Sequence, residues 1–160
     1  MSLPGPLSFS VALFLAYGAV YVLIGTLTPL LHNRGLRPQI LIITARADTE
    51  LFGTPPADLL RDDPVLARLR SILLNMVGGL LTGAGCMVLA LAWFGLRSGQ
   101  AWALGALGLA GAVVLPFWRL ALWPYVRAGV RLQLFDLPPF MWIPAALLGP
   151  ALVLGWIGLR

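Results

Sequence analysis

The sequence is poor in charged residues and contains no lysine. Of its 160 residues, 59% are hydrophobic and 11% are charged, whereas a soluble domain carries about 25% charged residues. So few charges cannot cover a water-facing surface, and the apolar residues gather in long runs. The composition therefore predicts a membrane protein.

Cysteine and histidine each occur once, which excludes several kinds of site within one chain. Cys86 has no second cysteine with which to form a disulfide. The single histidine, His32, excludes a bis-histidine haem and the zinc motif HExxH. The absence of lysine excludes a P-loop. We therefore predict no metal, no catalytic residue and no cofactor, and leave open a bound lipid.

Acidic residues are absent from the apolar runs. All six lie between them, at positions 48, 50, 58, 62, 63 and 136. Proton and cation relays usually require carboxylates or histidine inside the membrane. The distribution therefore disfavours a proton-coupled transporter.

Four apolar runs predict an all-α integral membrane four-helix bundle in a single domain, residues 1–160. The predicted spans are 9–31, 71–96, 100–125 and 138–159, and about 20 residues are enough to cross the hydrocarbon core. No basic residue precedes the first run, and no A-x-A site follows it, so we predict an uncleaved helix. The short link at 97–99 predicts an antiparallel hairpin.

The polar loop at 32–63 contains three local signals. The run ILIIT at 40–44 indicates a strand or a strip on the membrane interface. Thr54, followed by two prolines, predicts the N-cap of a short helix. Asp63 and Pro64 predict the N-cap and first position of a helix that continues into the second span.

Arginines are distributed unequally between the two sides. The 97–99 turn and the C-terminus carry Arg97 and Arg160, whereas the other eight that flank the spans lie at positions 34, 37, 46, 61, 68, 70, 127 and 131. Basic residues favour the cytoplasmic side. We therefore predict a protein of the bacterial inner membrane with both termini outside and the 32–70 and 127–137 loops cytoplasmic.

Small residues on the predicted spans indicate helix packing. The glycines expected at helix contacts are Gly79, Gly83, Gly105, Gly108 and Gly155. Small residues let helix backbones approach closely. On the second span, the face that carries Gly79 could instead line a ligand site or contact another subunit.

Polar side chains in the first two spans suggest a pocket. Tyr17 and Tyr21 are four residues apart and share a helix face. Their hydroxyls need partners in the membrane, and Asn75 or Thr82 could supply them. The pattern is explained either by hydrogen bonds between helices or by a site for a lipid, a quinone or a sterol-like molecule.

The end of the third span carries a cation–indole–cation series. Arg119, Trp123 and Arg127 follow one another at four-residue spacing. Arg119 lies near the predicted boundary, where its side chain can extend outward. The series predicts an anchoring collar with cation–π stacking and contact with lipid headgroups.

Two segments carry a loose family resemblance. ELFGTPPADLLRDDPVL and WFGLRSGQAWAL resemble small bacterial four-helix membrane proteins of unknown function, over residues 50–125. The order of elements is similar to the plan of DoxX-like proteins and, more distantly, of the sterol-binding EXPERA group. EXPERA members use intramembrane acidic residues and histidine, which the spans of this chain lack. The resemblance therefore implies an architecture and no isomerase activity.

Three functional hypotheses follow from the sequence. The first is a non-catalytic accessory or structural subunit of a larger membrane complex. The second is a membrane-embedded binder of a lipid, quinone or other hydrophobic ligand, and the third is a small membrane enzyme or transporter. The expected partners are membrane lipids and other membrane subunits or further copies of the chain, and no nucleic acid.

Overall fold

Four long helices make up most of the protein. The computed structural model describes residues 5–35 and 39–160. The long helices are α1 (Gly5–Asn33), α4 (Pro64–Ala90), α5 (Ala101–Arg127) and α6 (Pro139–Leu159). Each is long and apolar enough to cross a membrane. The predicted all-α class and four spans are confirmed. The first two spans begin earlier than predicted, the last two begin one residue later, and all four end within two residues of the predicted end.

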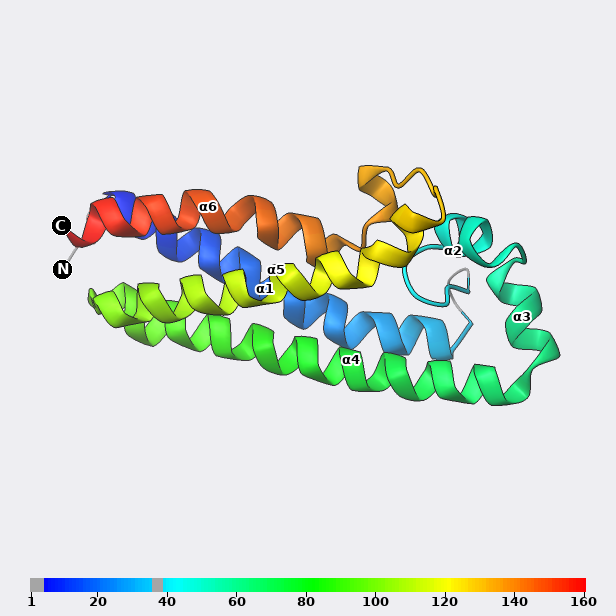
Figure 1. Cartoon of the computed structure of the whole chain (residues 1–160). Coiled ribbons are helices and arrows are strands. Elements are labelled where there is room, and N and C mark those ends of the chain that lie inside the picture. Colours follow the sequence, from blue (N-terminus) through cyan, green and yellow to red (C-terminus); the bar gives the residue numbers. More distant parts are fainter. Residues whose placement is uncertain (1–4, 36–38) are drawn as a thin grey trace.

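The bundle has two different ends (Figure 1). The start of α1, the C-terminus and the α4–α5 turn lie at one end, which we call the terminal end. The α1–α4 loop and the α5–α6 connection lie at the other end, the loop end. This grouping follows from four successive predicted spans. Which end faces the cytoplasm stays a prediction.

The α4–α5 turn is as short as the sequence predicts. Helical turns at Leu91–Gly95 and Leu96–Ser98 continue α4 to the terminal end. Gly99 then reverses the chain with φ of 74°, a left-handed conformation that glycine adopts without strain. A Cβ at Gly95 would lie 2.6 Å from the Cβ of Ala103. The hairpin is therefore tightly packed where its two helices meet.

Helix α1 is the most buried of the four. Along one face, Gly18 and Gly25 contact Gly85 and Gly78 of α4. A Cβ at Gly85 would lie 2.7 Å from the carbonyl oxygen of Gly18. The absence of side chains at these positions lets the two backbones touch, which is how small residues stabilise helix pairs in membranes.

Helix α1 also packs against α6. The buried Ser10 donates a hydrogen bond of 2.7 Å to the carbonyl oxygen of Ala151. A Cβ at Gly158 would lie 2.5 Å from the backbone nitrogen of Leu7. The main core then forms where Phe14, Leu107 and their neighbours from all four helices meet. Helix α1 thus joins α4 to α6.

Two short helices lie in the α1–α4 loop: α2 (Ala45–Phe52) and α3 (Pro56–Asp62). Helix α3 begins where a short helix is predicted, but its N-cap is Pro55 and no side chain caps it, so the assignment of Thr54 as the cap is wrong. Proline at the first helical position supplies the helical φ and has no N–H to satisfy. Helix α2, capped by Thr44, was not predicted.

The run at 40–44 does not form a strand. Residues 39–44 are irregular, and the backbone N–H groups of Leu41, Ile42 and Ile43 donate to the carboxylate of Asp48. That carboxylate takes the donors that a neighbouring strand would otherwise bind. The strand interpretation of ILIIT is therefore wrong.

Helix α4 extends beyond the length of a membrane span. Asp63 caps it by accepting the N–H groups of Val65 and Leu66, at 2.9 and 3.1 Å, and Pro64 occupies the first position, as predicted. The helical segment Pro64–Ser98 has 35 residues, or about 52 Å, against a hydrocarbon core of about 30 Å. Its first turns can therefore lie outside the core, where α3 packs against them.

Candidate functional site

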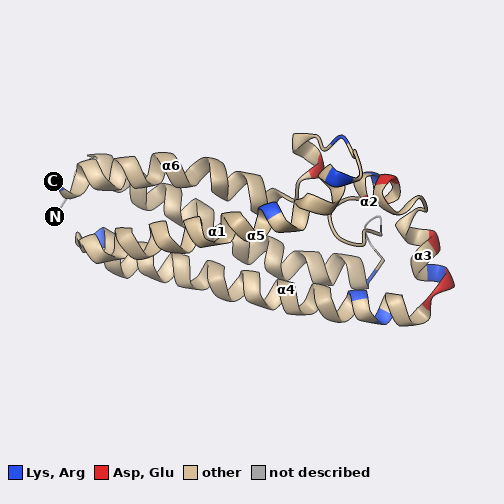
Figure 2. Ribbon diagram, in the orientation of Figure 1, with Lys and Arg blue, Asp and Glu red and all other residues tan. Residues whose placement is uncertain are grey.

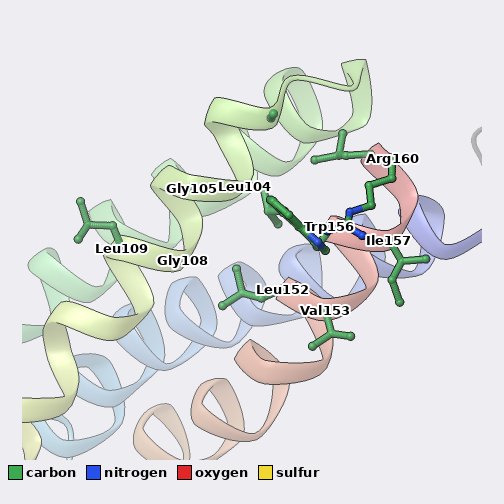
Figure 3. Close-up of a pocket in the computed structure, with 11 residues that line it drawn as sticks. Leu104, Gly105, Gly108, Leu109, Leu152, Val153, Trp156, Ile157 and Arg160 are labelled. Atoms are coloured by element: carbon green, nitrogen blue, oxygen red, sulfur yellow. The ribbon is translucent and has the colours of Figure 1, made fainter.

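A groove runs between α5 and α6 at the terminal end (Figure 3). It has a volume of 730 Å³, within the range of about 300–1,000 Å³ that is typical of ligand sites. Its lining is almost entirely apolar and includes Leu104, Leu109 and Val153. Because the groove opens on the outer surface of the bundle, a ligand could enter it from the side.

Gly105 of α5 lines an open part of the groove. A Cβ at this position meets no other described part of the chain within 4 Å. Further along α5 the space closes: Leu152 packs on Gly108, 3.0 Å from the position of a Cβ, and Leu148 packs on Gly111 at 2.6 Å. The two helices therefore touch through Leu104 and Gly155 near the terminal end and interlock toward the middle of the bundle, and the groove lies beside these contacts.

The end of the groove carries an indole and a guanidinium. Trp156 points from α6 toward α5 (Figure 3), and the guanidinium carbon of Arg160 lies 4.9 Å from the centre of its ring. A second pair lies at the same end, with Arg97 stacked 4.1 Å from the ring of Trp93. Both are cation–π contacts.

The two ends of the bundle differ in their charged residues: acidic residues lie only at the loop end (Figure 2). All six acidic residues belong to the two loops of the loop end, whereas the terminal end carries Arg97 and Arg160 and no acidic side chain. The two arginines at the terminal end therefore have no acidic side chain nearby to neutralise them.

A buried polar cluster lies at the loop end, around Asp48. Its side chain is fully buried and accepts, besides the three backbone N–H groups described above, a hydrogen bond of 2.6 Å from the hydroxyl of Tyr125. Ile43, Ala47 and Val130 pack around Tyr125. The cluster therefore fastens the α1–α4 loop to the end of α5.

Arg70 of α4 joins this cluster. Its Nε donates to the carbonyl oxygen of Ile40, and the guanidinium is attracted to Asp48. Its Nη2 is buried and has no hydrogen-bond partner among the described residues. The contacts hold the start of residues 40–44 against α4.

A second contact joins the two loops of the loop end. Arg46 of α2 forms an ion pair with Asp136 and also donates to the carbonyl oxygen of Arg131. Hydrogen bonding to the Arg46 guanidinium holds the pKa of the Asp136 carboxyl below its ordinary value, and a backbone N–H from Gln133 adds to this. The same ion pair raises the pKa of Arg46. Sequence reasoning treated both residues only as loop charges.

The four residues of the predicted pocket make separate hydrogen bonds. Tyr17 and Tyr21 are buried in the main core, and their hydroxyls lie 3.4 Å from each other. Asn75 is exposed and accepts a hydrogen bond of 2.9 Å from the side chain of Asn33. Thr82 donates to the carbonyl oxygen of Gly78. Each tyrosine hydroxyl thus has the other as a partner, rather than Asn75 or Thr82.

The predicted collar lies on an exposed face of α5. Arg119, Trp123 and Arg127 are all exposed. The guanidinium carbon of Arg127 lies 5.6 Å from the ring centre of Trp123, which is the predicted stacking for this pair. Whether the collar binds lipid headgroups stays a prediction.

The glycines expected at helix contacts fall into two groups. Gly108 contacts Leu152, and Gly155 contacts Ser10 and Leu104. Gly79, Gly83 and Gly105 have open space at the Cβ position, with no other described residue within 4 Å. Within the chain, α4 instead uses Gly78 and Gly85. Gly79 and Gly83 therefore face away from the bundle.

Comparisons with protein-family models, curated proteins and solved structures give no match for this chain. The resemblance to the DoxX-like plan is therefore limited to the presence of four long apolar helices, and no family is identified for the chain. What these helices define is a small multi-pass membrane protein.

Proposed function

We propose that this chain is a non-catalytic accessory subunit that binds the helices of a larger membrane complex through the outer face of α4. The observation that carries the proposal is the glycine pair Gly79 and Gly83, which faces outward with no other described residue near it. A glycine pair allows a second helix backbone to approach closely, whereas lipid chains gain little from it.

The inner face of the same helix supports this interpretation. Gly78 and Gly85 let α1 approach α4 to backbone contact, so this helix already forms one glycine-based contact. Gly79 and Gly83 offer a second, on another face. The thiol of Cys86 is exposed and follows Gly79 and Gly83 at helical spacing, so it can report on what lies against that face.

Substitution of both outward glycines tests the proposal. Gly79→Leu with Gly83→Leu places bulk on this face, where a Cβ meets no other described residue within 4 Å. After extraction in a mild detergent, native mass determination should find the wild-type chain with other membrane subunits and the double variant without them. The matched control is Gly149→Leu on α6, which also has open space among the described residues and should keep the partners.

Cross-linking from Cys86 supplies an independent measurement. A reagent with a thiol-reactive and a photoreactive end should join the wild-type chain to a larger subunit in the membrane, and a Cys86→Ser variant should give no product. A wild-type chain that purifies alone, or only with further copies of itself, would contradict the proposal. So would a double variant that keeps the same partners as Gly149→Leu.

A further inference from the structure

We propose that the groove between α5 and α6 binds one acyl chain of an anionic phospholipid, with its headgroup beside Arg160 at the terminal end. This site is separate from the α4 face that the proposed function uses. It also differs from the pocket and the collar that the sequence suggests.

The depth of the groove matches one leaflet of a bilayer. From Ala101 to Leu109, the first and last α5 residues of its lining, the helix rises about 12 Å. Half of a hydrocarbon core is about 15 Å. The groove ends where Leu152 and Leu148 fill the space over Gly108 and Gly111. A chain that enters from the terminal end thus meets a closed floor near the middle of the membrane.

The end of the groove fits the level of a lipid headgroup. Trp156 and Arg160 line it there, and Trp93 and Trp102, both exposed, lie near the same end. Tryptophan favours the membrane–water interface. An acyl chain between α5 and α6 would therefore place its headgroup next to the guanidinium of Arg160.

The charge at this end selects an anionic headgroup. Arg160 is stacked on Trp156, and Arg97 lies at the same end, where the sequence has no acidic side chain. A guanidinium binds a phosphate with planar paired donors. A lipid with a net negative headgroup gains this attraction, whereas in a zwitterionic lipid a positive group offsets it.

The shape of the groove favours an acyl chain over a partner helix. A helix that crosses the membrane would follow α5 and α6 through both leaflets, but the space between these helices is closed beyond Gly108. The open part is only as deep as one lipid chain. It is also lined by aliphatic side chains and by the bare backbone of Gly105.

Two substitutions test the chain site and the headgroup site separately. Purified full-length protein is placed in nanodiscs of phosphatidylglycerol and phosphatidylcholine with identical acyl chains, and the lipids retained on release are counted by native mass spectrometry. Gly105→Leu fills the groove and should lower the occupancy of both lipids about tenfold. Arg160→Gln should leave the groove open and lower the preference for phosphatidylglycerol about fivefold.

The control for Gly105→Leu is Gly149→Leu, which adds the same side chain to α6 at a glycine outside the groove. It should retain lipid like the wild-type protein. Equal lipid retention in the two leucine variants would overturn the proposal, as would equal preference for both headgroups in the wild-type protein. A photoreactive residue at position 105 that labels a protein segment and no lipid would assign the groove to a partner helix and overturn it as well.

Discussion

Gly25 of α1 and Gly78 of α4 face each other so closely that neither could carry a side chain. A Cβ at Gly25 would lie 2.7 Å from the carbonyl oxygen of Gly78, and a Cβ at Gly78 would lie 2.5 Å from that of Gly25. Gly18 and Gly85 repeat the relationship further along the same two helices. The α1–α4 pair is therefore held by contact between backbones.

Alanine at Gly78 should destabilise the bundle. The added methyl group must displace the backbone of α1, and overpacking of this kind costs about 1–3 kcal/mol. The free energy of unfolding can be measured in mixed micelles by titration with a denaturing detergent. Gly79→Ala is the matched control, because its methyl group meets no other described residue within 4 Å. Equal losses for the two variants would show that the α1–α4 contact is not this close.

The Asp48–Tyr125 hydrogen bond should stabilise the loop end. Tyr125→Phe removes only the hydroxyl that donates to Asp48, and hydrogen bonds to charged groups are worth about 1.5–3 kcal/mol. Asp48→Ala should cost more, because it also leaves the N–H groups of Leu41, Ile42 and Ile43 without their acceptor. Hydrogen exchange of residues 39–52 measures both effects. If residues 39–52 exchange equally fast in the Tyr125→Phe and Asp48→Ala variants, the backbone contacts of Asp48 contribute nothing to the stability of the loop end.

The position of Asp48 shows what the sequence could not reveal. Asp48 and Tyr125 are 77 residues apart, and no local pattern links a loop acid to a tyrosine at the end of a span. A run of β-branched residues before Asp48 favours a strand in isolation, but the buried carboxylate binds the N–H groups that a strand would offer. A tertiary contact thus decides the local structure of residues 40–44.

The positions of the spans and of the α4 cap, in contrast, are set by local chemistry. Apolar runs of this length are typical of membrane spans, and Asp63 with Pro64 favours the start of a helix. Local chemistry does not determine which face of α4 packs against α1. Gly78 and Gly79 differ by one residue, or about 100° around the helix, and a run rich in small and apolar residues does not distinguish them. Only the position of α1 selects Gly78.

Acidification should loosen the contact between the two loops. The pKa of Asp136 lies below its ordinary value of 3.8 in the folded protein, so its ionised form stabilises the fold above that value. This contribution is lost as the pH falls through the lowered pKa. Hydrogen exchange of residues 131–137 should therefore accelerate from about pH 6 to about pH 2, after correction for the intrinsic rate.

The Asp136→Asn variant is the control for this pH dependence. Its amide cannot form the ion pair with Arg46, so residues 131–137 should exchange faster than in the wild-type protein at neutral pH. The difference between the two proteins should shrink as the wild-type carboxylate becomes protonated. A constant difference across the whole pH range would contradict a role for the Asp136 charge.

The predicted orientation places the loop end in the cytoplasm, because most arginines flank the spans there. In a Cys86→Ser background, cysteine introduced at Ser98 of the α4–α5 turn should react with a membrane-impermeant maleimide in intact spheroplasts. Cysteine at Asp62, which is exposed at the end of α3, should react only after the membrane is permeabilised. The reverse pattern would invert the topology and place the groove between α5 and α6 in the cytoplasmic leaflet.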